Sequence, residues 1–179
     1  MKALSNNFNG GSRQKGLTLI ELMISLSIAA IVLAGIYAVY QGTTNDQSTT
    51  TEIRSAQAIA SKIRNIFPNG RNNYSGLSNQ MVINAQGFPA NMNTSGTTVY
   101  NTWAGTVTVA ANAAPGFDIT YGSVPKYACQ PFVAGAEVGF YAIKIGTTTV
   151  KTSGGVLDMT AVGTACAGTA PFTIVFSGN

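Results

Sequence analysis

Few side chains in this sequence are able to do chemistry, and their types limit what that chemistry can be. The 179 residues include ten Lys and Arg, six Asp and Glu, two Cys and no His. Without histidine the usual catalytic triads and imidazole metal ligands are excluded, and two cysteines outside a Cys-x-x-Cys pattern do not make a metal site. Asp118 and Asp158 could form a carboxylate pair, but nothing in the sequence brings them together. We therefore expect no catalytic residue, no cofactor and no metal.

The most unusual acid is Glu21, because it is the one charge in an apolar run from Leu17 to Tyr40. As a helix this run is about 36 Å long, enough to cross a hydrocarbon core of about 30 Å. An acid at mid-bilayer costs roughly 2.5 to 3.5 kcal/mol, and less near the interface, so such a residue is usually paired. The run predicts a membrane-spanning helix whose carboxylate needs a partner.

The basic residues around this run are distributed unevenly. Lys2, Arg13 and Lys15 precede it, and no further base follows until Arg54. By the positive-inside rule the N-terminus stays in the cytoplasm and the remainder is exported. A secretory signal peptide has a shorter apolar core, of about 7 to 15 residues, followed by a small-residue cleavage site. Alanines within the run could imitate such a site, so that alternative stays open.

The junction itself resembles a known processing signal. Lys15 and Gly16, followed by Leu17-Thr18-Leu19-Ile20-Glu21, are similar to the class III leader junction of type IV prepilins and pseudopilins. The resemblance implies that a prepilin peptidase cuts after Gly16, that Leu17 becomes the methylated first residue, and that Glu21 pairs with the N-terminal amine of a neighbouring subunit during assembly. Two features depart from the pattern: Leu17 stands where Phe or Met is more typical, and the 16-residue leader is intermediate between type IVa and type IVb lengths.

After Tyr40 the sequence predicts a second, amphipathic part of the same helix. Residues 42–51 are mostly Thr, Ser, Asn and Gln, which are mediocre helix formers, so whether they are helical stays open. Apolar residues then recur at helical spacing at Ile53, Ala56, Ala60 and Ile63, and we place Glu52 among the polar positions between them. Phe67-Pro68-Asn69-Gly70 ends the helix.

The rest of the chain predicts an antiparallel sheet. Residues 68–104 are loop-rich, and beyond them apolar residues alternate in four runs, with residues 147–151 as a candidate fifth. The four runs contain Val107 and Val109; Phe117, Ile119 and Tyr121; Tyr141, Ile143 and Ile145; and Phe172, Ile174 and Phe176. A short helix near Pro125 is expected to be shortened or kinked at Pro131. The fold class is therefore α+β, with a long N-terminal helical spine packed on an antiparallel sheet.

Both cysteines, Cys129 and Cys166, lie in the part expected to be exported. In an oxidising compartment two thiols favour a disulfide over free cysteines. Closing a loop of about 38 residues would stabilise the fold by roughly 4 kcal/mol in the chain-entropy model.

The C-terminal part resembles the type IVb major pilins of the toxin-coregulated and conjugative thin-pilus class. The resemblance rests on Trp103 to Val109, Phe117 to Tyr121, Val124-Pro125 with Cys129 nearby, and the late Cys166. It implies the pilin fold and four parts: a cleaved cytoplasmic leader (1–16), a transmembrane and filament-core helix (17–40), its amphipathic continuation (41–67), and a globular α+β domain (68–179) with a disulfide-bounded C-terminal region.

The function that the resemblance implies is structural. It is that of a major pilin polymerised through its N-terminal helix, with the prepilin peptidase, the inner-membrane assembly machinery and other pilin subunits as partners. The subunit would sit in the inner membrane of a Gram-negative bacterium before entering a surface pilus for adhesion, aggregation or conjugation. A minor pilin or secretion pseudopilin is the alternative, and a signal-anchored periplasmic binding domain the second. Loss of the leader lowers the net charge from +4 to +1, which argues against nucleic acid as the main partner.

Overall fold

The computed structural model describes residues 18–68, 74–112 and 116–179, so Gly16 and Leu17 lie outside the described part. Contacts within the chain divide it into two compact units, Met1–Gln41 and Gly42–Asn179. The second unit, which we call the head, contains all the described strands.

Helix α1 (Leu19–Ile66) includes the polar stretch at residues 42–51, which answers the question that the sequence left open. The hydroxyls of Ser48 and Thr49 donate to the carbonyls of Thr44 and Asn45, one turn earlier, at 2.9 Å each. These side chains therefore bond within the helix, as serine and threonine can in helix interiors. Thr49 is also buried in the head, so tertiary contact supports a stretch whose propensity is poor.

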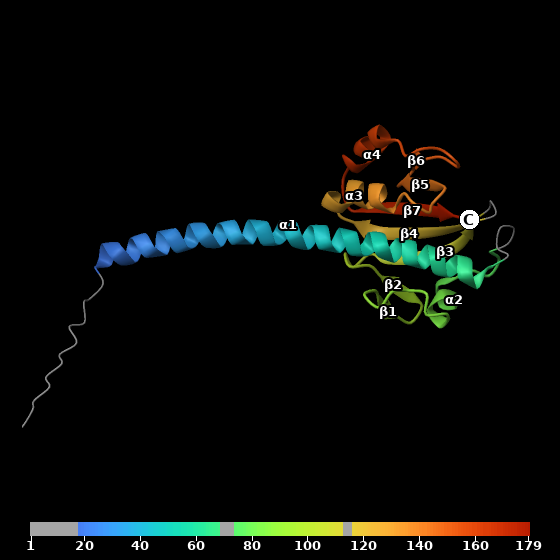
Figure 1. The fold of residues 1–179 in the computed structure, drawn as a ribbon, viewed down its shortest axis with the longest axis horizontal. Coiled ribbons are helices and arrows are strands. Elements are labelled where there is room, and N and C mark those ends of the chain that lie inside the picture. The colour runs from blue at the N-terminus through green and yellow to red at the C-terminus, as the bar shows by residue number, and fades with distance from the viewer. Residues whose placement is uncertain (1–17, 69–73, 113–115) are drawn as a thin grey trace, which may run out of the picture. The chain divides into compact units, whose positions relative to one another are not determined.

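The head is built on a sheet in which every described pairing is antiparallel, with strand order β1-β2-β3-β4-β7-β5-β6. The predicted runs correspond to β3 (Thr106–Asn112), β4 (Gly116–Val124), β5 (Ala142–Ile145), β6 (Thr148–Lys151) and β7 (Phe172–Gly178). Two short strands, β1 (Asn93–Ser95) and β2 (Thr98–Tyr100), lie within the region expected to be loops. Figure 1 shows β1 and β2 at one edge of the sheet and β5 and β6 at the other.

Three shorter helices complete the head: α2 (Asn79–Asn84), α3 (Lys126–Ala136) and α4 (Met159–Cys166). The helix expected near Pro125 is α3. Of the two expected effects of Pro131, a shortened or a kinked helix, the shortening is wrong. The helix continues to Ala136 because Phe132, Val133 and Ala136, which follow the proline, are all fully buried. Their burial offsets the backbone hydrogen bond that proline cannot make.

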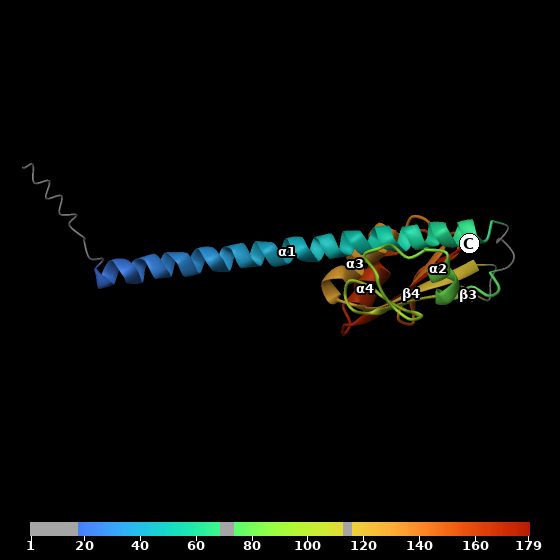
Figure 2. The same ribbon diagram turned by 90° about the horizontal axis from the view of Figure 1, so that it is seen from below.

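The core lies between one face of the sheet and the second half of α1. Figure 2 shows residues 42–66 of this helix lying along the sheet. The register places Ile119 opposite Phe176 and Tyr121 opposite Ile174, so that alternate side chains of β4 and β7 form one buried face. Ile59 and Ile63 of α1 are fully buried in the same core.

Candidate assembly segment and buried polar contacts of the head

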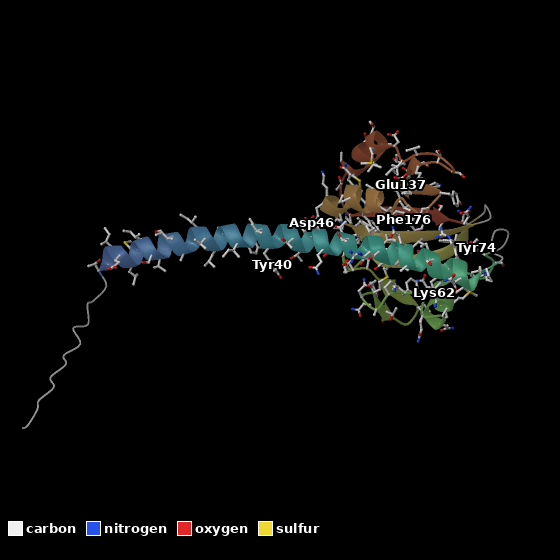
Figure 3. All side chains as sticks on the ribbon, in the orientation of Figure 1. Tyr40, Asp46, Lys62, Tyr74, Glu137 and Phe176 are labelled. Carbon is white, nitrogen blue, oxygen red and sulfur yellow. A yellow bond between two sulfur atoms is a disulfide. The ribbon has the colours of Figure 1, made fainter. Side chains whose placement is uncertain are left out.

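The N-terminal half of α1 is an apolar surface without cover in the single chain. Every large apolar side chain from Leu19 to Tyr40 is between 50% and 78% exposed. Figure 3 shows these side chains radiating from the helix as far as Tyr40. The most apolar window of the helix has a mean hydropathy of 2.4, so by length and composition it is able to cross a membrane. This surface needs lipid or another protein chain around it.

Glu21 lies in the first turn of α1, where an acid interacts favourably with the helix dipole. Its backbone N–H is 3.4 Å from the Thr18 hydroxyl, which accepts a long hydrogen bond, and its carbonyl accepts one from Ser25 at 2.7 Å. Among the residues that the structure describes, no side chain pairs with the Glu21 carboxylate. Pairing with an amine of another subunit therefore remains a prediction, as do the roles of Gly16 and Leu17.

The cysteines of the head behave as predicted. Cys129 of α3 and Cys166 at the end of α4 form a disulfide, with their Cα atoms 5.8 Å apart and a sequence separation of 37. The bridge links α3 to the chain segment between β6 and β7. It confirms the expected pairing, and both cysteines are buried in the core.

The two aspartates considered as a carboxylate pair have separate structural roles. Asp158 caps α4 by accepting hydrogen bonds from the N–H groups of Thr160 and Ala161 at 2.9 and 3.1 Å. Asp118 accepts hydrogen bonds from the Ser177 hydroxyl at 2.6 Å and from the Asn112 amide at 3.0 Å. Both carboxylates thus hold local structure.

Glu52 is the polar residue whose position the sequence did not predict. Instead of lying among the polar positions of α1, it is fully buried on the same helix face as Ala56, Ile59 and Ile63. Spacings of four, three and four residues place these four side chains on one stripe, and that periodicity was the available signal. The expectation that Glu52 lies among the polar positions, which follows from its charge alone, is therefore wrong.

The Glu52 carboxyl reaches the loop between β2 and β3. Its Oε1 atom accepts hydrogen bonds from the Thr102 N–H at 2.7 Å and from the Thr102 hydroxyl at 2.8 Å. Burial raises the pKa of the Glu52 carboxyl, and the two Thr102 hydrogen bonds partly oppose that rise. Its other oxygen, Oε2, is buried and has no partner among the described residues.

The loop at residues 101–105 is held in a shape that presents Thr102 to Glu52. Asn101 organises it: the Asn101 Oδ1 accepts from the N–H groups of Trp103 at 3.0 Å and Gly105 at 2.8 Å, while its amide donates to the Gly122 carbonyl at 2.9 Å. Gly105 lies so close to that carbonyl that a Cβ would clash with it. Only glycine fits this approach of loop to strand.

Two more polar groups, one on the same loop and one on β4, are also buried. The Tyr121 hydroxyl and the Trp103 indole N–H are both buried and, within the described residues, have no hydrogen-bond partner. The rings of both residues contact Phe132 edge-on, with centroid distances of 5.0 and 5.4 Å. Burial and the Glu52 charge raise the pKa of Tyr121 well above its usual range. The Phe132 ring of α3 therefore packs against both the loop at residues 101–105 and β4.

Arg64, in the last turn of α1, connects the end of the helix to two other segments. Its guanidinium donates to the carbonyl of Asn179 at 2.8 Å and to that of Gly139, and lies 5.5 Å from the centre of the Phe117 ring. Glu52 and Arg64 therefore join the second half of α1 to the rest of the head, one near each end of this part of the helix.

Comparison with protein-family models matches two segments of the chain. Residues 11–37 match the prokaryotic N-terminal methylation motif, and residues 44–179 match the family described as PilS N terminal. The first match includes Gly16, Leu17 and Glu21, and the second spans the head.

Curated relatives and a solved structure agree with these matches. The chain is 28% identical over 160 residues to the major structural subunit of bundle-forming pilus of Escherichia coli O127:H6 (strain E2348/69 / EPEC), covering 85% of this chain and 82% of the relative. The protein of the same description from Escherichia coli O111:H- is 29% identical over 149 residues, covering 79% and 77%. The crystal structure of TcpA, a type IV pilin from Vibrio cholerae El Tor biotype, is similar in fold, with a TM-score of 0.53 at 16% identity, covering 74% of this chain and 99% of that one.

Proposed function

Because the chain belongs to the PilS N-terminal family and carries the prokaryotic N-terminal methylation motif, we propose that it is the major structural subunit of a type IVb-like pilus. The curated relatives that it resembles over most of their length are major structural subunits of a bundle-forming pilus. Their role is structural, and we assign no catalytic activity to this chain.

The observation that carries this proposal is the exposed apolar half of α1 with its single acid. A surface of large side chains that are 50–78% exposed cannot stay in water, and lipid and neighbouring subunits are the two environments that would cover it. A pilin meets both in turn. Before assembly it is inserted in the inner membrane, and the assembly machinery then moves its helix into the core of the surface filament.

Processing prepares the segment for this transfer. A prepilin peptidase cuts after Gly16, and Leu17 becomes the methylated first residue. The cut removes Lys2, Arg13 and Lys15, which would be costly to place inside an apolar filament core.

Glu21 then acts as a register mark between subunits. In the filament core its carboxylate is desolvated, so leaving it unpaired is costly, while pairing with the Leu17 amine of the adjacent subunit offsets that cost. A subunit shifted along the filament would lose this pairing. The carboxylate contributes more to correct placement than to net stability.

Mass spectrometry of the mature N-terminus tests the processing step. The expected species begins with methylated Leu17, and replacing Gly16 with a bulky residue should leave the unprocessed precursor. An intact Met1 in the wild-type chain, or a start beyond Ala34, would instead indicate a signal anchor or a cleaved signal peptide.

Electron microscopy of cells with and without the gene tests the structural role. If filaments form and contain this chain only in trace amounts, the chain is a minor pilin.

A further inference from the structure

We infer that Glu52 is a neutral carboxylic acid in the folded head, and that it acts as a proton-dependent latch joining α1 to the loop at residues 101–105. The side chain is fully buried, and both of its described hydrogen bonds come from Thr102, 50 residues away in the sequence. The latch lies within the head and does not depend on the pilin assignment.

The unequal surroundings of the two carboxyl oxygens favour the protonated form, although the Thr102 hydrogen bonds by themselves would favour the ionised one. The carbonyl oxygen of a carboxylic acid has two lone pairs, and Oε1 accepts two hydrogen bonds, at 2.7 and 2.8 Å. The second oxygen of the acid carries a proton and donates. Oε2 is buried, and no described group donates to it. An ionised carboxylate would leave half its charge on a buried Oε2 that has no partner among the described residues, which is costly.

Among the described residues, the groups that the contacts place near Glu52 supply no compensating positive charge. From β4 the facing titratable group is Tyr121, whose ionised form would repel a carboxylate. The loop contributes Thr102 and Trp103, and α3 contributes the ring of Phe132 against Tyr121 and Trp103. None of these four residues is cationic.

Charges on α1 itself also point elsewhere. The nearest in the sequence, Asp46 and Arg54, have exposed side chains, and the described ion pair of the head joins Lys151 to Glu137 at 3.1 Å. Burial without a cation explains why the pKa of Glu52 is raised above 4.5, the value of a solvated glutamate.

The latch has a defined dependence on pH. Because the folded state holds the proton more tightly than the unfolded chain, the stabilisation is complete below pH 4.5 and is lost as the pH rises through the folded pKa. Within that window, opening of the loop becomes up to about tenfold more favourable per pH unit, and above it the dependence levels off.

Infrared spectroscopy of the full-length chain in detergent micelles tests the protonation directly. At a pH just above 4.5, the wild type should show the carbonyl band of a buried carboxylic acid. The band should disappear when the pH is raised through the pKa of Glu52 in the folded head. In E52Q the band should be missing throughout. E137Q, which removes a partly exposed acid paired with Lys151, should keep it. A wild type that shows no buried-acid band at any pH above 4.5, or an E52Q variant that shows the same band, would overturn the inference.

Hydrogen exchange at the Thr102 amide tests the latch. After correction for intrinsic exchange, loop opening in the wild type should increase with pH and then level off. In E52Q, whose amide oxygen can still accept from Thr102 and whose amide group can donate, opening should not vary with pH. The same pH dependence in wild type and E52Q would refute the latch.

Discussion

The two glutamates of α1 face opposite situations on one helix. Glu21 lies in an apolar segment whose side chains are exposed, and no described side chain pairs with its carboxylate. Glu52 lies in the head, fully buried, and accepts two hydrogen bonds from Thr102 of the same chain. Within the described residues, therefore, one acid has no partner for its carboxylate, and the other accepts hydrogen bonds from a distant part of the same chain.

This difference corresponds to different environments for the two halves of α1. Its first half is apolar on all sides, as expected for a helix surrounded by lipid or by other helices. Its second half has one buried stripe, which the sheet covers. Changes in the first half should therefore affect assembly and spare the head, and changes in the second half should do the reverse.

The largest expected effect is on filament assembly. Glu21→Ala should insert into the membrane normally but form no filaments in cells lacking the wild-type subunit, because the neighbouring amine loses its partner. Electron microscopy of the cell surface and membrane fractionation measure the two steps. Thermal unfolding of the head should match that of the wild type. Abundant filaments in this variant would remove Glu21 from the assembly mechanism, and E137Q serves as the control for loss of an acid in the head.

The disulfide should matter for the head alone. Replacing both Cys129 and Cys166 with serine should lower the free energy of unfolding of the head by roughly 4 kcal/mol. The reason is that the unfolded chain is no longer closed into a loop by a bond between residues 37 positions apart. Denaturant unfolding followed by circular dichroism measures this change. Membrane insertion of the purified precursor should not change, and a defect in insertion would contradict the separation of the two regions.

The same substitution in each half of α1 gives a matched pair. Ile59→Ala removes a fully buried side chain and should destabilise the head by about 2 to 5 kcal/mol. Ile28→Ala removes a side chain that is 58% exposed and should change head stability by no more than about 0.5 kcal/mol. Both variants are compared by denaturant unfolding in the same detergent. Equal losses would mean that the two halves are not energetically distinct.

A smaller effect is expected at the cap of α4. Asp158→Ala removes the acceptor for the N–H groups of Thr160 and Ala161, which should cost about 1 kcal/mol. Thermal unfolding of the variant should show a modest decrease in midpoint. Asp158→Asn retains a capping oxygen and should recover most of the difference, so equal losses in both variants would assign the effect to charge instead of capping.

Local patterns in the sequence predicted much of this fold. The strands β3, β4, β5 and β7 were predicted because their side chains alternate between a buried and an exposed face. The strands β1 and β2 were missed, since three residues each are too few to show a period and they contain mostly Asn, Thr and Ser. Helix α4 was missed for a similar reason, because its eight residues include small and polar types.

The two glutamates show the same contrast between what a local pattern reveals and what depends on distant residues. Glu21 was found because one charge in a long apolar run is a local anomaly, visible without any knowledge of the fold. Glu52 was misplaced because its charge suggested solvent, while its burial depends on donors from Thr102, 50 residues further along. Pro131 was misjudged because the buried residues that follow it extend α3.

By itself, then, the sequence determined which segments are apolar, which alternate and where the cysteines lie, since these depend on neighbours along the chain. The tertiary structure decided which polar groups are buried, which strands lie side by side, and how far α3 extends. Burial of a carboxyl is favourable only where the fold supplies its hydrogen-bond donors, and no local pattern records donors that come from a distant loop.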